Sequence, residues 1–287
     1  MGDFFEKADS NISFILEHEK KFYDEILLRR KQSSKLDQDK WRKETILERK
    51  QRLSKEIYNR YSGKVSFGPF CGMQLSSELP RTHPDLGSLL LGFYEYQVVQ
   101  FITSEIFKNL ELFVDIGASE GYFPIGMLYG GFCETAIAYE DCPKSAKIMM
   151  QQAKKNGVKD RLVIKGRAKH NFVGDLDLQH RKNTLVLCDI EGGEFDLFTE
   201  EVLFQLSKST VIIEIHDWYH DNFIELYSRL LRDADKFFNV KFLKPKTRPI
   251  EEIYDLHSFT DDNRLLICSE HRPSQMRFLV LSPKTAT

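Results

Sequence analysis

The feature that most limits the fold is an alternation of short apolar runs with helix-like segments, which begins at Leu110. Five apolar runs are predicted strands, and they are ELFVDIG (111–117), ETAIAYE (134–140), RLVIKG (161–166), NTLVLCDIE (183–191) and STVIIEIH (209–216). Helix-like segments lie at 121–131, 142–157 and 195–207, whereas 167–181 is irregular. Strands that are apolar on both faces and alternate with helices are typical of a parallel sheet covered on both sides. The sequence therefore predicts an α/β fold.

The segments that flank this alternation have a different character. In the tail, FNVKFLKPK (238–246), NRLLICSEH (263–271) and MRFLVLSP (276–283) are predicted strands with no long helix between them. Three such strands favour an antiparallel edge to the sheet. Before the first strand, the pattern predicts a turn followed by a helix from about Gly92 to Phe107.

The first 62 or so residues have a helical period of their own. Apolar positions in 12–32 and again in 37–61 predict two amphipathic helices that are joined near SSKLDQD (33–39). Their charges are mixed, which is typical of a solvated helix face and does not favour a ligand-binding role. We predict a helical extension over 1–64 that packs on the main domain or on a second copy of the chain, and a main domain over 65–287.

Composition excludes several classes of protein. The chain has 287 residues, 41% of them hydrophobic, which is enough for a buried core. The formal net charge of −2 argues against a dedicated nucleic-acid binder, which needs a basic field to neutralise phosphates. The five cysteines show no CxxC pair and are expected to be reduced core residues of a cytoplasmic protein. The start, MGDFFEKADS, is not laid out as a signal peptide, and no apolar run reaches the ~20 residues of a membrane span.

The loop after the first predicted strand, DIGASEG (115–121), is the first candidate site. In an open α/β sheet the ligand binds beyond the carboxyl ends of the strands, and Gly117 and Gly121 permit a sharp turn and a close approach of the backbone to a ligand. A dinucleotide needs G-x-G-x-x-G, but the middle glycine is missing here, and Glu120 would repel a pyrophosphate. S-adenosylmethionine carries a sulfonium and an ammonium, so Asp115 and Glu120 would favour it.

A second acid supports the same cofactor. Glu140 ends the next predicted strand, 23 residues after Gly117, where a carboxylate can accept hydrogen bonds from both ribose hydroxyls. Asp141 follows it and is expected on the adenine side. An ordinary strand-to-helix turn with solvated acids is the alternative interpretation of these residues.

The segments VDIGASEGYF, YEDCP, LVLCDIEGGEFDLF and VIIEIHDW resemble the class I S-adenosylmethionine-dependent methyltransferases and, among them, the FkbM-like group. The resemblance covers about 86–217 well and the tail loosely, and it leaves out the N-terminal helices. It implies a Rossmann-like sheet of seven strands with the last antiparallel. It also implies methylation of a hydroxyl oxygen on a carbohydrate or secondary metabolite.

The resemblance also extends, more weakly, to Tyr94 and Glu95, which would close over the methionine end, and to Arg167 and Ala168, which would flank the adenine. The candidate cofactor residues are therefore Tyr94, Glu95, Asp115, Gly117, Ala118, Glu120, Gly121, Tyr122, Glu140, Asp141, Arg167, Ala168 and Asp189.

Acidic residues and histidines follow the fourth and fifth predicted strands, which are neighbours in this topology. They are Asp189, Glu191, Glu194, Glu214, His216, Asp217 and His220. Carboxylates this close together repel one another unless they are solvated, paired with a cationic side chain, protonated or bound to a metal ion. The candidate catalytic residues are His216, as the base that accepts the acceptor's proton, then Asp189 and Glu214. Two alternatives stay open: a divalent metal held by Asp189, Glu214 or His216, and purely structural ion pairing.

Other functions compete with this prediction. An NAD-type oxidoreductase is disfavoured by the glycine spacing and by Glu120, and a non-catalytic scaffold by the intact set of Asp115, Gly117 and Glu140. Single arginines such as Arg272 and Arg277 in the tail usually lie at the protein surface. Binding of an acidic acceptor is the weaker interpretation of these two residues. Expected partners are a small-molecule or carbohydrate acceptor and a second copy of the chain, with no nucleic acid and no membrane span.

Overall fold

The computed structural model describes residues 44–77, 85–178, 183–270, 272 and 274–284, together with ten positions between 13 and 28. Those ten positions are helical, as predicted for the first amphipathic segment. The predicted joint at 33–39 and the start of the second predicted helix, with Trp41, lie outside the described residues.

Seven strands form one sheet in the order β3-β2-β1-β4-β5-β7-β6. Their bounds are β1 Leu110–Ile116, β2 Cys133–Tyr139, β3 Leu162–Lys165, β4 Thr184–Cys188, β5 Thr210–Ile215, β6 Phe238–Phe242 and β7 Arg277–Pro283. The first five strands pair in parallel, and β7 runs antiparallel to both β5 and β6. A Rossmann-like α/β sheet of seven strands with a reversed last strand is therefore present, and it confirms the predicted fold class.

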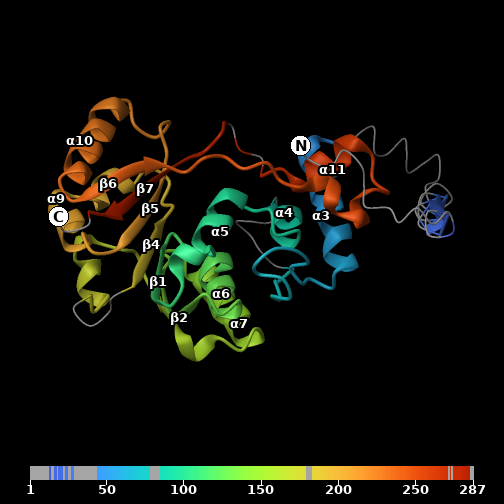
Figure 1. The fold of residues 1–287 in the computed structure, drawn as a ribbon, viewed down its shortest axis with the longest axis horizontal. Helices are drawn as coiled ribbons and strands as arrows, with labels where there is room; N and C mark the ends of the chain where they lie inside the picture. Colours follow the sequence, from blue (N-terminus) through green and yellow to red (C-terminus); the bar gives the residue numbers. More distant parts are fainter. Residues whose placement is uncertain are drawn as a thin grey trace.

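Helices cover both faces of the sheet (Figure 1). They include α6 Tyr122–Tyr129, α7 Pro143–Lys155, α8 Glu194–Leu197, α9 Glu200–Gln205 and α10 Phe223–Asp235. Alternate residues of β1 enter two separate cores: Phe113 packs in the core that contains α6 and α7, and Val114 in the core that contains α9 and α10. Burial on both faces explains why the central strands are apolar throughout. The structure also contains α10, which our sequence analysis did not predict.

The predicted helix over 92–107 is confirmed only in part, as α5 Tyr96–Ile102 and a 3-10 turn at Glu105–Phe107. A separate short helix, α4 Leu86–Leu90, precedes α5. Between them Gly92 has φ +69, and a β-carbon there would lie 2.2 Å from the Phe67 carbonyl oxygen. Glu95 has φ 43, a left-handed conformation that ends any continuous helix. Tyr94 and Glu95 therefore lie in a tight connection and not on a helix.

The predicted tail strand over 263–271 is also wrong, because Asp261–Cys268 forms the helix α11. A short apolar run such as LLIC does not distinguish a buried strand from a helix by its period. The two aspartates that begin α11 are typical of a helix N-terminus. Between β6 and β7 the chain leaves the sheet, reaches α11 beside α3, and returns (Figure 1).

The second predicted N-terminal helix is α3, Ile46–Arg60. It begins with a capping box in which Thr45 and Glu48 satisfy each other's backbone N–H groups. Leu53 and Ile57 are fully buried in the core that α4 and α11 also enter. The buried Lys50 amine lies 2.7 Å from the Asp85 carboxylate just before α4. The domain boundary between 64 and 65 stays a prediction.

In the part of the chain that the structure describes, no helix combines the length and the apolar character needed to cross a membrane.

Candidate functional site

A cavity of about 970 Å³ lies beyond the carboxyl ends of β1, β2, β4 and β5. Most of the predicted cofactor residues line it, namely Tyr94, Asp115, Gly117, Ala118, Glu120, Tyr122, Glu140, Asp141, Arg167, Ala168 and Asp189. Gly121 and Glu95 are not part of the wall. Of the predicted catalytic residues, His216 and Asp189 line the cavity, whereas Glu214 lies behind them with no exposed surface. The strand ends thus bring the predicted cofactor residues and the predicted catalytic residues together. The role of each residue stays a prediction.

The glycines of the first loop are needed for contacts within the protein. Gly117 has φ +92, and a β-carbon on it would lie 1.7 Å from the Asp189 carbonyl oxygen on the neighbouring strand end. Gly121 has φ +90, and a β-carbon there would lie 2.4 Å from Met149 of α7. We expected these glycines to bring the backbone close to a ligand. In the structure they let the loop fit between β4 and α7, because both missing side chains would point at protein atoms.

Asp115 ends up in an unusual environment. It is 2% exposed, it lines the cavity, and no donor among the described residues bonds to its Oδ2 atom. Burial raises its pKa well above the usual range, and the nearby carboxylates of Asp189, Glu95 and Glu140 raise it further. A buried carboxylate without a donor is costly. A positively charged group in the cavity would remove that cost.

Backbone amides hold Glu140 in place. Its Oε2 atom accepts the Ser119 N–H at 2.8 Å, and its Oε1 atom accepts the Cys142 N–H at 2.7 Å. The carboxylate therefore ties the loop after β1 to the loop after β2. Glu120 is oriented by its neighbour, because the Ser119 hydroxyl donates to its carboxylate at 2.7 Å.

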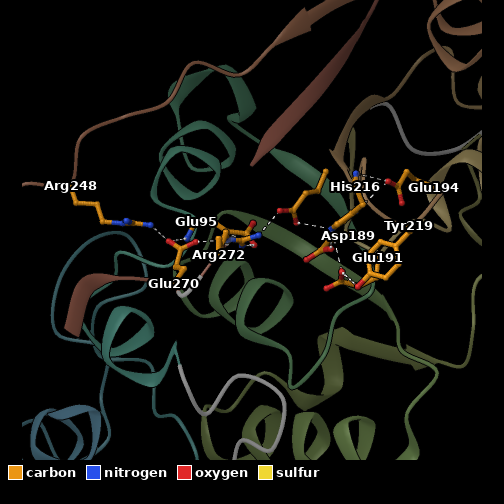
Figure 2. Close-up of polar contacts among 10 residues, drawn as sticks. Glu95, Asp189, Glu191, Glu194, His216, Tyr219, Arg248, Glu270 and Arg272 are labelled. Carbon is orange, nitrogen blue, oxygen red and sulfur yellow. Dashed lines mark hydrogen bonds and ion pairs between the residues drawn. The ribbon is translucent and has the colours of Figure 1, made fainter. Parts of the chain in front are cut away.

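The second group of side chains is centred on His216, which is 2% exposed (Figure 2). Its Nε2 atom lies 3.4 Å from Asp189 Oδ1, 3.6 Å from Glu191 Oε2 and 4.0 Å from Glu214 Oε2. On the other side of the ring, Nδ1 lies 3.2 Å from Glu194 Oε1. Glu194 is fully buried, and it also accepts the N–H groups of His216 and Gly192. One imidazole thus faces four carboxylates.

These carboxylates change the protonation of His216. Burial lowers its pKa, but the hydrogen bonds to Asp189 and Glu194 and their charges outweigh burial and raise the pKa to about 10. A protonated imidazole has no lone pair with which to accept a proton. We expected a neutral His216 to act as the base. The surroundings of His216 in this structure oppose that role at neutral pH.

Arg272, which is itself part of the cavity wall, joins three acidic side chains (Figure 2). Its guanidinium lies 2.6 Å from Glu95, 2.5 Å from Glu214 and 2.8 Å from Glu270, and Glu270 also pairs with Arg248. Arg272 is therefore engaged within the protein, which argues against its binding an acidic acceptor.

Burial raises the pKa of two of the acidic side chains that contact Arg272. It raises the pKa of Glu95 to about 7, although the charge of Arg272 opposes the shift. It also raises the pKa of Glu214 well above its usual range, and the neighbouring charge of Asp189 adds to the increase.

Two further predicted residues lie outside the cavity wall. Asp217 lies 3.4 Å from the guanidinium of Arg277, and both side chains are about half exposed. His220 Nε2 lies 2.8 Å from the Gly192 carbonyl oxygen, within hydrogen-bonding distance. Both residues hold loops together and neither faces the cavity.

Several residues of the cavity wall were not predicted from the sequence. Trp218 and Tyr219 lie against the His216 ring at centroid distances of 5.4 and 6.1 Å, and they are 44% and 52% exposed. Their position directly after His216 was the available signal. Asp85 and Glu270 also line the cavity, but they come from segments whose sequence gives no sign of it.

Negative charge dominates the wall. Among the described residues it contains nine carboxylates, against Arg167, Lys169 and Arg272 as the lysine and arginine members. Such a wall favours a cationic ligand over a pyrophosphate, because like charges at close range repel.

No protein-family model and no curated protein matches the sequence. Several solved structures share part of the fold at low identity. The tRNA m1A22 methyltransferase TrmK of Bacillus subtilis is 10% identical over 65% of this chain and 64% of its own, with a TM-score of 0.41. An rRNA methylase of Streptococcus thermophilus is 9% identical over 66% of this chain and 95% of its own, with a TM-score of 0.43.

A third structure is that of a putative tRNA (m1A22) methyltransferase of Streptococcus pneumoniae in complex with S-adenosyl-L-methionine. It is 14% identical over 66% of this chain and 72% of its own, with a TM-score of 0.39. The match spans less than two thirds of the Bacillus protein. Similarity at this level is too weak to indicate a substrate.

Proposed function

We propose that this chain is an S-adenosylmethionine-dependent methyltransferase that methylates a hydroxyl oxygen of a carbohydrate or secondary metabolite. The observation that carries the cofactor is Asp115, a buried carboxylate on the cavity wall whose Oδ2 atom has no donor among the described residues. A cationic ligand provides the missing partner, and a dinucleotide pyrophosphate does not.

Different loop residues would bind different parts of the cofactor. Asp115 would bind the positively charged methionine end of the cofactor, and Tyr94 lines the same cavity. Glu140, which backbone amides fix in place, would accept hydrogen bonds from the ribose hydroxyls. When bound, S-adenosylmethionine supplies an electrophilic methyl group on a sulfonium that leaves readily. The chain then has to position the acceptor oxygen about 3 Å from that carbon and to exclude competing water.

The open end of the cavity favours a neutral acceptor with hydroxyl groups. The exposed rings of Trp218 and Tyr219 offer an apolar face with polar edges, on which a sugar or aromatic ring can pack. Glu191 and Asp196 are carboxylates that can accept hydrogen bonds from hydroxyls. Because the same carboxylates repel phosphates, we expect no nucleic-acid acceptor.

The first prediction concerns Glu140. Calorimetry with S-adenosylhomocysteine should give a micromolar dissociation constant, worth about 7–8 kcal/mol. Glu140→Gln should weaken this binding by about 1–3 kcal/mol, because hydrogen bonds to a charged acceptor are lost. The matched control is Glu134→Gln, an exposed residue near the opposite end of β2, which should leave binding unchanged. Tight NADH binding with no response to the adenosyl ligand would instead favour the oxidoreductase.

The acceptor is tested by transfer of a radioactive methyl group from S-adenosylmethionine. We expect label on sugars or hydroxylated metabolites, and we expect it to resist mild base because methyl ethers do so. Label that mild base releases would indicate a carboxyl acceptor, and label recovered in RNA would contradict the proposed substrate class.

A further inference from the structure

We propose that the chain binds one divalent cation of the Mn²⁺ type between Asp189 Oδ1, Glu214 Oε2 and His216 Nε2. The three side chains come from the ends of β4 and β5, at the side of the cavity opposite Glu140. Ion binding stands on the geometry of these residues alone. Only the use of the ion to hold an acceptor oxygen rests on the proposed methyl transfer.

The distances fit one shared ion. Atoms bound to a common ion at about 2.1 Å lie no more than about 4.2 Å apart. His216 Nε2 is 3.4 Å from Asp189 Oδ1 and 4.0 Å from Glu214 Oε2, and the three side chains bring their ligand atoms within 4.8 Å of one another. Small side-chain shifts would bring all three atoms to an ion. In the part of the chain that the structure describes, no other group of three His, Cys, Asp or Glu side chains does this.

The two oxygens that face the imidazole are buried and lack a close donor. Glu214 Oε2 has no hydrogen-bond partner among the described residues, and Asp189 Oδ1 meets only His216 Nε2, at 3.4 Å. An ion bound here would take the place of the proton on Nε2. Glu214 has no exposed surface, and its other oxygen is bound to Arg272. A buried carboxylate oxygen without a donor is rare and needs an explanation. A cation at this point gives both oxygens a partner at once.

The imidazole is oriented as metal-bound histidines usually are. Glu194 lies 3.2 Å from Nδ1 and is itself fixed by the backbone amides of Gly192 and His216. A carboxylate on the far nitrogen sets the tautomer and points the other nitrogen at the metal. Glu194 therefore acts as a positioning residue that turns Nε2 of His216 toward Asp189 (Figure 2). The same nitrogen faces Glu214 at 4.0 Å.

Charge favours a cation as well. The connected group of ten residues drawn in Figure 2 contains six carboxylates but only two guanidinium groups, those of Arg248 and Arg272, together with the His216 imidazole. Carboxylates left in excess in a low-dielectric site repel one another strongly. A divalent ion offsets this excess where it is largest.

The ligand set selects the ion. Two carboxylate oxygens and one imidazole nitrogen suit a first-row divalent transition-metal ion such as Mn²⁺ better than Ca²⁺, which prefers oxygen ligands alone. Asp189 and His216 line the cavity, so the remaining coordination positions face the ligand space. An acceptor hydroxyl bound there would be held in place, and its pKa would be lowered.

The test titrates the full chain with Mn²⁺ alone and follows the loss of the free-ion electron paramagnetic resonance signal. We expect saturable binding of one ion per chain. Asp189→Asn and Glu214→Gln should each weaken it by at least about 10–100-fold, and Glu194→Gln by about 10–100-fold through the histidine. Asp196→Asn is the matched control, an exposed carboxylate on the same cavity wall, and it should not change Mn²⁺ affinity.

A second measurement needs no variant. With labelled histidine, bound Mn²⁺ should broaden the ring signals of His216 and leave those of His257 sharp. Either no saturable binding or an unaffected His216 would overturn the proposal, and so would binding that survives both Asp189→Asn and Glu214→Gln. Mn²⁺ binding without binding of S-adenosylhomocysteine would contradict the proposed function but not the ion site. Binding of S-adenosylhomocysteine without Mn²⁺ binding would contradict the ion site but not the proposed function.

Discussion

Among the glycines that the structure describes, Gly117 should be the one at which replacement by alanine is most damaging. The new β-carbon would lie 1.7 Å from the Asp189 carbonyl oxygen, and the backbone has φ +92, which alanine rarely adopts. The obstacle is backbone at the end of a central strand, so no side chain can rotate away. We expect a loss of more than about 4–5 kcal/mol in the free energy of unfolding, the range of exceptional substitutions, and loss of cofactor binding.

Two matched variants separate the clash from the backbone strain. Gly157 also has a positive φ, +69, but a β-carbon there meets nothing within 4 Å, so Gly157→Ala should cost only about 1–2 kcal/mol. Gly166 has open space and no positive φ, so Gly166→Ala should be close to neutral. Urea unfolding of the three variants measures the difference. A Gly117→Ala protein as stable as Gly157→Ala would mean that the Asp189 carbonyl does not restrict the side chain at position 117.

Gly117 also shows what sequence reasoning could and could not supply. The pattern of Asp115, Gly117 and Glu140 located the site, because residues that follow parallel strands must meet at one edge of the sheet. The strands β1, β2, β4 and β5 were predictable for a related reason, since burial on both faces makes them largely apolar. The purpose of the glycine was not predictable, because it depends on the Asp189 carbonyl, 72 residues further along the chain.

The residues that the sequence analysis placed wrongly depend on contacts that are distant in sequence. Glu95 leaves the helical conformation where its carboxylate meets Arg272, 177 residues away. The short run LLIC forms a helix, with Ile267 and Cys268 buried against α3 and α4, whereas in isolation it fits a strand equally well. Likewise, Asp189 and Glu194 raise the pKa of His216, and the sequence does not show how close their carboxylates come to the imidazole.

Arg272→Met should cause the second large loss in the free energy of unfolding, because it removes the cation from a buried group of acidic side chains. Glu95 and Glu214 are 2% and 0% exposed, and both lose a guanidinium contact. Breaking a buried pair by removing one partner costs about 3–5 kcal/mol, since the remaining charge stays buried. Arg277→Met is the matched control, because its contact with Asp217 is long and half exposed, and it should cost no more than about 1 kcal/mol.

The effect of Arg272→Met should depend on pH in a defined direction. Burial raises the pKa of Glu95 to about 7 while Arg272 lowers it, and the nearby charge of Asp189 raises it. A carboxyl group with a raised pKa in the folded state stabilises the fold below its unfolded value of 4.5 and loses this contribution as pH rises through about 7. Without Arg272 the pKa of Glu95 rises further, and the loss extends to higher pH.

The difference in unfolding free energy between the natural chain and Arg272→Met should therefore be small near pH 5, where the acids are protonated in both proteins. It should grow toward the full value of about 3–5 kcal/mol near pH 8, where the natural chain has ionised Glu95 beside a guanidinium and the variant has none. Urea unfolding at both pH values measures this, with Arg277→Met giving the same small difference at each. An Arg272→Met penalty that does not change with pH would mean that Arg272 stabilises the chain through its packing on Tyr94 and not through its charge.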